Sequence, residues 1–362
     1  MKNNYYLVTI PFVFLISSNA LATIELTDDL LFSAFGSTSI TTTDNETPIY
    51  INREINDETC FDCDTTLGLQ LDYQFLNNFT TSIQVVKRPQ DNWSEPALEW
   101  LHLGYSFSQF DIKIGRLRTP TFLDSEYYYV GHAYTTARPS NEVYDSQLGV
   151  TSYDGLTLKW QGELTDDIAL SVEPYASFFG EGKATKGPQK YIFDIHSMLG
   201  VKVELSSYDY RFYMNALRTE YDLELQLAVP RYTLHLKDQA INTYSFGGEY
   251  LWDQLTMRAE AYYAQDSHFD WYAQLSYRFN KLSPYANYGQ MHSVGSGREN
   301  SSRAITAGLR YDFTPNISMN LEYQKAFTEN YFPSTSGQFT ETFAPGSDTD
   351  ANIYTLMLNF IL

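Results

Sequence analysis

The two cysteines of the sequence, Cys60 and Cys63, form a Cys-Phe-Asp-Cys motif within an acidic stretch. This spacing occurs in redox-active pairs, in one half of a metal site and in small disulfide loops. A redox pair requires a helix N-terminus after the first cysteine, and a structural zinc site requires two more ligands nearby. The motif lies in a predicted acidic loop, so it favours a structural disulfide, and we expect no metal there.

A second group of residues carries charge of both signs and could line a narrow channel. The four bases are Arg88, Lys113, Arg116 and Arg118, and the four acids are Asp124, Glu126, Glu142 and Asp145. Opposed rows of charge create a transverse field that orders water and passes polar solutes while disfavouring apolar ones. Such a field filters solutes without a binding site. The alternative is that these charges lie at a polar rim.

Two of these bases have the wrong parity for a channel wall. Arg116 and Arg118 alternate in step with apolar Ile112 and Ile114, which we expect to face lipid. If the two arginines face the channel, either Gly115 hosts a bulge that switches the face or the strand has left the membrane by that point.

Enzymatic chemistry finds little support. The six histidines (102, 132, 196, 235, 268 and 292) are scattered, and neither Gly-x-Ser-x-Gly nor His-Glu-x-x-His occurs. A Ser-His-acid set is recognised by geometry, which a sequence does not supply. We expect no catalytic residues and no cofactor.

Composition narrows the classes of protein. The 24 Lys and Arg residues against 44 Asp and Glu give a net charge of −20, which disfavours nucleic acid as a partner, since binding it requires clustered positive charge. Beyond the N-terminus no apolar run reaches the length of about 18 residues that a transmembrane helix needs. Tyrosine (30) and phenylalanine (23) are heavily used. A secreted β protein or an outer-membrane β-barrel remains.

The N-terminus predicts a signal peptide over residues 1–22. Lys2 precedes an apolar run from Tyr5 to Ile16, and Ala20-Leu21-Ala22 is a small-x-small cleavage pattern. We therefore expect a mature chain of residues 23–362 that forms one barrel domain in an oxidising compartment.

Alternation with a period of two is the dominant pattern along this chain. Leu69 and Leu71, for example, alternate with Gln70 and Asp72, as expected of a strand with one apolar face. Such segments are joined by turns of two length classes, and short turns alternate with longer loops. The longer loops are 41–65, 89–96, 118–146, 179–192, 220–240, 265–268, 293–302 and 328–351.

This arrangement predicts an all-β fold, a transmembrane antiparallel barrel with short periplasmic turns and longer external loops. Seven short turns and eight long loops give sixteen strands. A hairpin hidden in 220–240, from 223–227 and 232–236, would give eighteen. Closure is required because every backbone N–H and C=O within hydrocarbon must be paired.

The faces of the predicted strands differ in chemistry. Aromatic side chains gather beside the short turns, where we expect a girdle at the membrane interface: Tyr73, Phe75, Phe107, Tyr277, Phe279, Tyr311 and Phe313. The opposite, lumen-facing parity carries nearly balanced charge. Its bases are Arg88, Lys113, Lys159, Lys202, Arg211, Arg258, Arg278 and Arg310, and its acids are Asp72, Asp111, Glu163, Glu173, Glu204, Glu249, Glu260, Asp312 and Glu322.

The C-terminal residues 353–362 place every second apolar side chain on one face. These are Tyr354, Leu356, Leu358, Phe360 and Leu362. The pattern resembles the C-terminal assembly signal of outer-membrane barrels, which usually ends in phenylalanine; here the last residue is leucine.

Taken together, these features resemble the general porins of Gram-negative bacteria over the mature chain. The most specific stretch is Ile114-Gly115-Arg116-Leu117-Arg118-Thr119-Pro120, continued by residues 127–134 and by Arg138-Pro139. It is similar to a strand-loop segment of a gammaproteobacterial porin branch. In porins the long loop after the fifth strand narrows the lumen, so the resemblance implies that loop 118–146 carries the constriction.

The resemblance further implies a multi-pass barrel of the outer membrane. It also implies partners of four kinds: outer-membrane lipid and lipopolysaccharide, the barrel assembly machinery, two further copies in a homotrimer, and small hydrophilic solutes that diffuse passively. Two other functions stay open. One is a solute- or anion-selective channel with a low-affinity site at Arg88, Lys113 and Arg116. The other is a non-conducting adhesin or receptor that acts through acidic loops.

Overall fold

The computed structural model describes residues 23–76, 78–89, 95–227, 232–293, 301–329, 337–341 and 348–362. The predicted signal peptide, residues 1–22, lies outside them. The strands are β1 Ile24–Thr27, β2 Leu30–Thr43, β3 Thr66–Phe75, β4 Phe79–Lys87, β5 Ala97–Phe107, β6 Phe110–Arg118, β7 Ser152–Thr165, β8 Ile168–Lys186, β9 Gln189–Ser206, β10 Tyr210–Leu227, β11 Tyr232–Trp252, β12 Leu255–Ala264, β13 His268–Tyr277, β14 Leu282–Ser293, β15 Ser301–Thr314, β16 Ile317–Glu329 and β17 Asp350–Ile361.

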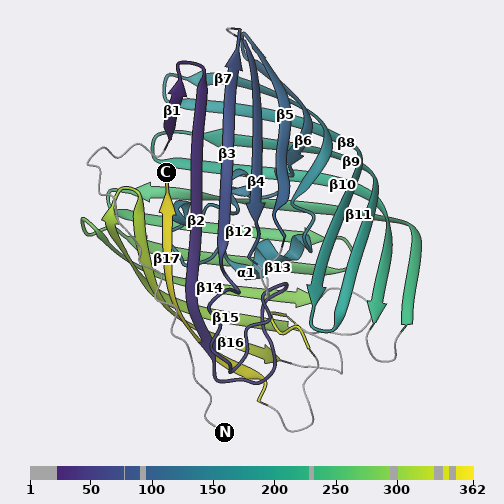
Figure 1. The fold of residues 1–362 in the computed structure, drawn as a ribbon, viewed down its shortest axis with the longest axis vertical. Helices are drawn as coiled ribbons and strands as arrows, with labels where there is room; N and C mark the ends of the chain where they lie inside the picture. The colour runs from purple at the N-terminus through teal and green to yellow at the C-terminus, as the bar shows by residue number, and fades with distance from the viewer. Residues whose placement is uncertain are drawn as a thin grey trace, which may run out of the picture.

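The strands form one closed antiparallel barrel (Figure 1). Each strand from β2 to β17 pairs with its neighbours in the chain, and β17 pairs with β2, for example Leu356 with Ile40. The short β1 pairs with the start of β2, Ile24 opposite Phe32, just beyond the end of β17 at Ile361. The described residues therefore make a sixteen-stranded barrel, as the loop pattern predicts.

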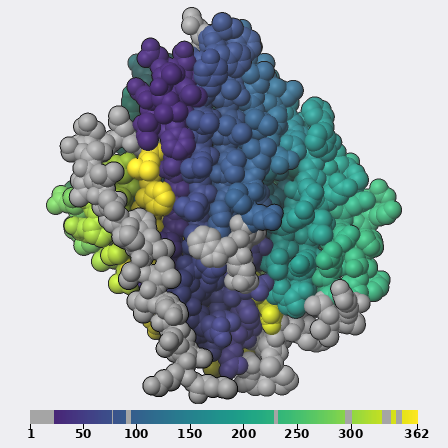
Figure 2. All heavy atoms as spheres, viewed as in Figure 1, coloured from purple at the N-terminus to yellow at the C-terminus, as the bar shows by residue number. Residues whose placement is uncertain are grey.

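The predicted alternation is confirmed on the barrel wall. Leu69 and Leu71 are exposed on the outside, while Gln70 donates to Asp72 on the inside. The girdle beside the short turns is a continuous row of rings on the outer face of β3–β6, which Figure 2 views from outside. Successive ring centroids lie 4.6–6.0 Å apart, in the order Tyr73, Phe75, Phe79, Tyr105, Phe107 and Phe110.

Two predicted loops are strands instead. Residues 179–192 belong to β8 and β9, which are joined only by Gly187 and Pro188. In 220–240, residues 223–227 and 232–236 do pair, Leu223 opposite Leu236, but as the ends of β10 and β11. The eighteen-strand alternative is therefore wrong. The glycine and lysine residues at 180–187 are typical of a loop, which is why the sequence predicts a loop there. In the structure, however, β8 pairs with β9 as far as Lys186.

Among the residues that the structure describes, the helical elements lie in the connection between β6 and β7. They are the 3₁₀ turns η1 (Ser125–Tyr127), η2 (Gly131–Ala133) and η3 (Asp145–Gln147) and the single-turn helix α1 (Asn141–Tyr144). In the described part of the chain, helices of the length and apolarity needed to cross a membrane do not occur.

Candidate pore constriction

The connection between β6 and β7, residues 119–151, lies inside the barrel and is called the inner loop below. Near its start, the Ser245 hydroxyl on β11 donates to the Thr121 carbonyl. Further along, the Asn320 amide on β16 donates to the Thr135 carbonyl at 2.7 Å. Because β11 and β16 stand apart in the barrel, the loop crosses the lumen between them. It matches the predicted 118–146 with a shift of a few residues at its end.

Two buried carboxylates of the wall hold the inner loop by its backbone. Glu260 on β12, 2% exposed, accepts the Leu123 N–H at 2.9 Å and the hydroxyl groups of Tyr213, Tyr272 and Tyr144 at 2.6, 2.6 and 3.0 Å. Four donors satisfy this carboxylate without a cation. The side chain thus fixes the loop at a defined height on the wall.

The second wall carboxylate holds the far side of the loop. Glu322 on β16 accepts the Ala137 N–H at 3.1 Å and the Tyr285 hydroxyl at 2.8 Å. Both glutamates belong to the predicted lumen-facing parity. Their partners come from the loop, so alternation predicts their side of the wall but not their role.

Arg138 joins the inner loop to the connection between β2 and β3, residues 44–65. Its guanidinium donates to Asp64 at 2.5 and 2.8 Å, and Arg53 lies 3.0 Å from the same carboxylate. Burial alone would raise the pKa of Asp64, but Arg138 and Arg53, with the Ser39 hydroxyl, hold this pKa well below its usual range. The two connections are therefore linked by a buried ionic contact.

The first of two charge clusters beside the inner loop is the clamp cluster: Arg88, Glu99, Arg118 and Tyr129. Glu99 is fully buried and receives Arg88 at 2.5 Å and Arg118 at 2.8 Å. The Tyr129 ring, from the loop, lies 4.8 Å below the Arg118 guanidinium. The cavities next to Tyr129 are only about 30 Å³ each, so this side of the loop is closely packed.

The second is the cavity cluster: Asp124 from the loop with Arg211, Glu249 and Arg258 from the wall. Asp124 pairs with Arg211 at 2.8 Å and with Arg258, while Glu249 lies 2.7 Å from Arg258 and 3.3 Å from Arg211. The Arg211 and Glu249 side chains are 27% and 28% exposed. The four side chains therefore form a ring in which positive and negative charges alternate, and part of this ring is exposed to solvent.

This cluster lines a cavity of about 370 Å³ between the inner loop and the wall. A neighbouring cavity of about 220 Å³ shares Ala133, Thr135 and Thr256 with it and continues to Arg278 and Arg310. Both are lined mainly by polar side chains. The open space beside the loop thus lies toward β10–β15, on the side away from the clamp cluster.

The four predicted bases and four predicted acids do not come together as one group in this structure, and their role in a constriction stays a prediction. Arg116 is on the outer face, where it forms a two-pronged pair with Asp154 at 2.6 and 2.8 Å. Gly115 has a φ of +130°, but β6 keeps its register with β5 and β7 through Arg116. The face therefore does not switch at Arg116, and only the last strand residue, Arg118, is turned inward.

The other predicted residues are dispersed within the lumen. Lys113 and Glu126 both lie close enough to His102 to act on it electrostatically, and Glu126 is exposed. Glu142 accepts from Ser140 at 2.5 Å and from Gln338 at 2.6 Å, and burial raises its pKa.

Asp145 accepts from Asn141 at 3.0 Å and lies 3.8 Å from Arg53. Of the eight predicted residues, only Asp124 contacts both guanidinium groups of the cavity cluster.

Sequence reasoning missed Glu99 because its parity matches that of lipid-facing Leu101 and Leu103. The ladder between β4 and β5 skips it: Val85 pairs with Leu98, and Gln84 pairs with Trp100. This bulge turns Glu99 inward. A carboxylate on an otherwise apolar face was the available signal, since an unpaired charge facing lipid is costly.

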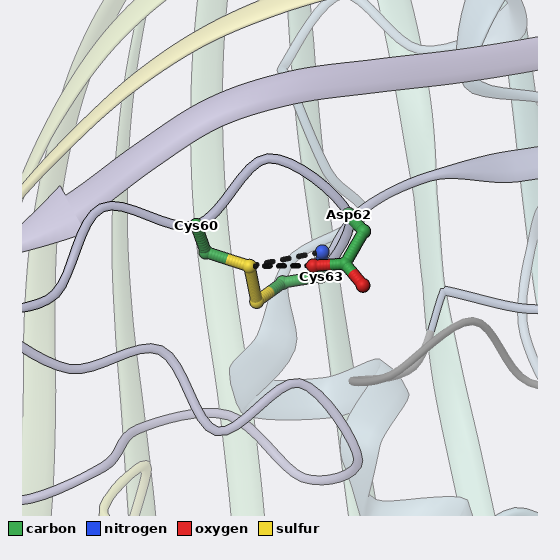
Figure 3. A group of neighbouring side chains, drawn as sticks. All are labelled: Cys60, Asp62 and Cys63. Atoms are coloured by element: carbon green, nitrogen blue, oxygen red, sulfur yellow. Dashed lines mark hydrogen bonds between the residues drawn. A yellow bond between two sulfur atoms is a disulfide. The ribbon is translucent and has the colours of Figure 1, made fainter. Parts of the chain in front are cut away.

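Cys60 and Cys63 are joined by a disulfide, shown in Figure 3. The Cys63 N–H donates to Cys60 Sγ at 3.1 Å, and the Asp62 carboxylate lies beside the same sulfur. Bonded sulfurs are not thiolates, so the group has no cation ligands other than one carboxylate. The disulfide directly precedes Asp64 and shapes the turn that presents it to Arg138.

The C-terminal strand has the predicted face. Tyr354, Leu356 and Leu358 are exposed on the outside of β17, in step with Phe360 and Leu362. Their role as an assembly signal stays a prediction.

No family model and no curated relative matches the sequence. In-vitro folded OmpT of Vibrio cholerae is similar in structure, with a TM-score of 0.61, 14% identity and coverage of 94% of this chain and 99% of that one.

Two other porin structures are similar. OmpF of Salmonella typhi, in complex with daunomycin, gives a TM-score of 0.61 at 13% identity, covering 93% and 100% of the two chains. An anion-selective porin from Comamonas acidovorans gives 0.58 at 7%, covering 92% and 99%. The chain thus has the sixteen-stranded fold of the Gram-negative outer-membrane porins, at low sequence identity.

Proposed function

We propose that this protein is an outer-membrane channel for the passive diffusion of small hydrophilic solutes and ions. The observation that carries the proposal is the inner loop, which crosses the lumen and leaves a polar cavity of about 370 Å³ on one side. A plug with a structural role alone would be expected to fill both sides. Here one side is packed around Glu99 and the other is lined by charged, partly exposed groups.

The cavity cluster supplies the filter in this proposal. Arg211 and Arg258 form ion pairs with Asp124 and Glu249 that leave part of each side chain exposed. Charges of opposite sign across a narrow wet space orient water and favour polar solutes. A low local dielectric constant strengthens their action on a passing ion. We therefore place the neck at Asp124 and the β10–β12 wall rather than at Arg88 and Lys113.

Location and assembly belong to the same proposal. The apolar outer face and the ring row at the short turns fit a lipid bilayer with those turns at the periplasmic interface. One OmpT structure is described as a trimer form, and we extend the homotrimer to this chain as a proposal.

Planar-bilayer recording tests the function. The refolded protein should insert and give stepwise conductance, with a reversal potential in asymmetric salt that responds to charge changes at Arg211 and Glu249. A folded protein, verified by β-type circular dichroism and heat-dependent gel mobility, that never conducts would overturn the channel and favour a receptor or adhesin.

A further inference from the structure

The strands β8–β11 continue past the rest of the barrel at the long-loop end, where they form a four-stranded sheet here called the external sheet (Figure 1). Within it, Lys186 pairs with Gln189, Gln226 with Lys190, and Leu227 with Tyr232. β12 ends lower, with Ala264 opposite Thr243. The external sheet thus rises without a neighbour on its β11 side among the described residues.

The outward-facing side chains change from apolar to charged where the strands enter this sheet. On β10 the outward side chains change from Phe212 and Met214 to Arg218 and Glu220, all of them exposed. On β9 they change from exposed Leu199 to Asp194. Water-facing charge outside indicates that the sheet has left the membrane.

The inner face of the external sheet is mainly apolar on β9, β10 and β11. Its lower part is covered: Phe193 and Ile195 are buried in a cluster that also contains Leu217. Its upper part carries Leu225, Leu227, Tyr232, Leu234 and Leu236, with Tyr232 57% and Leu236 37% exposed. Apolar area of this kind, next to an open strand edge, is a surface that a partner can bury.

The two edges of the external sheet differ in their contacts. On the β8 edge, Asn52 from the 44–65 connection donates to the Thr185 carbonyl at 2.9 Å and accepts the Thr185 N–H at 2.7 Å. Gly182 packs against Val150 on the same edge. On the β11 edge, residues 232–241 pair with β10 alone among the described strands. Unpaired edges template strand addition.

We propose that the β11 edge of the external sheet binds an extended polypeptide segment of another protein by strand addition. The segment would place apolar side chains over Tyr232, Leu234 and Leu236. It would place an acidic side chain on the outer face, toward exposed Lys237, because opposite charges on adjacent strands attract. The proposal does not depend on conduction through the barrel.

A second copy of this chain fits the edge poorly. Copies in one membrane are related by rotation about the membrane normal, which runs roughly along the strands. That rotation joins two β11 edges in parallel and turns one sheet over. The apolar face of one copy would then continue into the charged face of the other.

The bulge in β11 limits the length of the docking edge. The register shifts between the pairs Tyr221–Gln239 and Leu223–Leu236, and Asp238 has a φ of +53°. A bulge bends the strand and ends regular pairing. The straight part of the edge is therefore Tyr232–Leu236, which the central residues of a bound segment would match.

Binding of a labelled nine-residue peptide with alternating leucine and glutamate, measured by fluorescence anisotropy on the full protein in detergent, tests the proposal. A peptide of the same composition with its leucines and glutamates in two blocks is the first control, and one methylated at alternate backbone nitrogens is the second. We expect the alternating peptide to bind, and both controls to bind at least about tenfold more weakly because they cannot pair along the edge.

Matched charge reversals at the two edges distinguish binding at the β11 edge from non-specific electrostatic attraction of the acidic peptide. Lys237→Glu should weaken binding about threefold, whereas Lys183→Glu, which is also exposed but lies on the covered edge, should leave it unchanged. Leu234→Asp should remove it, with unchanged β-type circular dichroism and heat-dependent gel mobility showing that the barrel still folds. Absence of binding, equal binding of the block peptide, or equal loss in Lys183→Glu would overturn the proposal.

Discussion

The clamp cluster and the cavity cluster contain the same kinds of side chain but differ in their access to water. Glu99 is fully buried between Arg88 and Arg118. Glu249, which also lies between two arginines, has a side chain that is 28% exposed. A buried ion pair fixes the positions of its neighbours, whereas a solvent-exposed one can act electrostatically on ions and polar solutes beside it. The pattern of charges alone therefore does not distinguish a cluster that stabilises the inner loop from one that acts on passing solutes.

Removing the carboxylate of the clamp cluster should have the largest effect on stability. Glu99→Gln leaves two guanidinium groups without their shared counter-ion, and breaking a buried pair costs about 3–5 kcal/mol. Thermal unfolding in detergent, followed by circular dichroism, measures it. Glu249→Gln is the matched control and should cost less than about 1 kcal/mol because water screens it. Equal losses would remove the distinction between the clusters.

Acid should weaken the second buried contact, between the 44–65 connection and the inner loop. The folded-state pKa of Asp64 is held below its unfolded value, so its stabilising contribution is complete above about pH 4. That contribution is lost as pH falls from there toward the folded-state pKa.

Unfolding midpoints from pH 6 down to pH 2 check this, with Asp64→Asn flattening the acid limb of the curve. The exposed Asp348 provides the control, and Asp348→Asn should leave the limb in place. If Asp64→Asn keeps the same limb, Asp64 is not the group that titrates.

Selectivity should respond at the cavity cluster and not at the clamp. Arg211→Gln removes a positive charge at the neck and should shift the reversal potential toward cations, while Glu249→Gln should shift it toward anions. Recording across a tenfold salt gradient gives both values. A larger shift with Arg88→Gln than with Arg211→Gln would move the neck back to the clamp side.

The smallest effect is expected at the last external connection. Asp348 and Asp350 lie away from both clusters, and at 1 M salt the screening length is only about 3 Å. Asp348→Asn should therefore leave the reversal potential unchanged in concentrated salt. A shift as large as that of Glu249→Gln would show that the mouth, and not the neck, sets selectivity.

Much of the barrel was predictable because alternation is a local property. Leu69 and Gln70 differ in polarity, and a strand places neighbours on opposite faces whatever its partner is. In the external sheet the outward side chains are polar instead of apolar, because this sheet is surrounded by water and not by lipid. Above the membrane the outside is water, so Arg218 and Glu220 take the outward positions that Met214 holds below, and 179–192 and 220–240 resemble loops.

By itself, the sequence determined most of the strands and their outer faces, the sixteen-stranded closure and the position of the inner loop. Only the tertiary structure decided which charges meet. Asp124 and Arg211 are 87 residues apart and become neighbours because the closed barrel brings β10 in front of the loop. Glu99 reaches Arg118 because a bulge turns it inward, and Arg116 stays outside because Asp154 lies directly opposite on β7. Alternation follows from backbone geometry within one strand, whereas a pair of charges depends on the path of the whole chain.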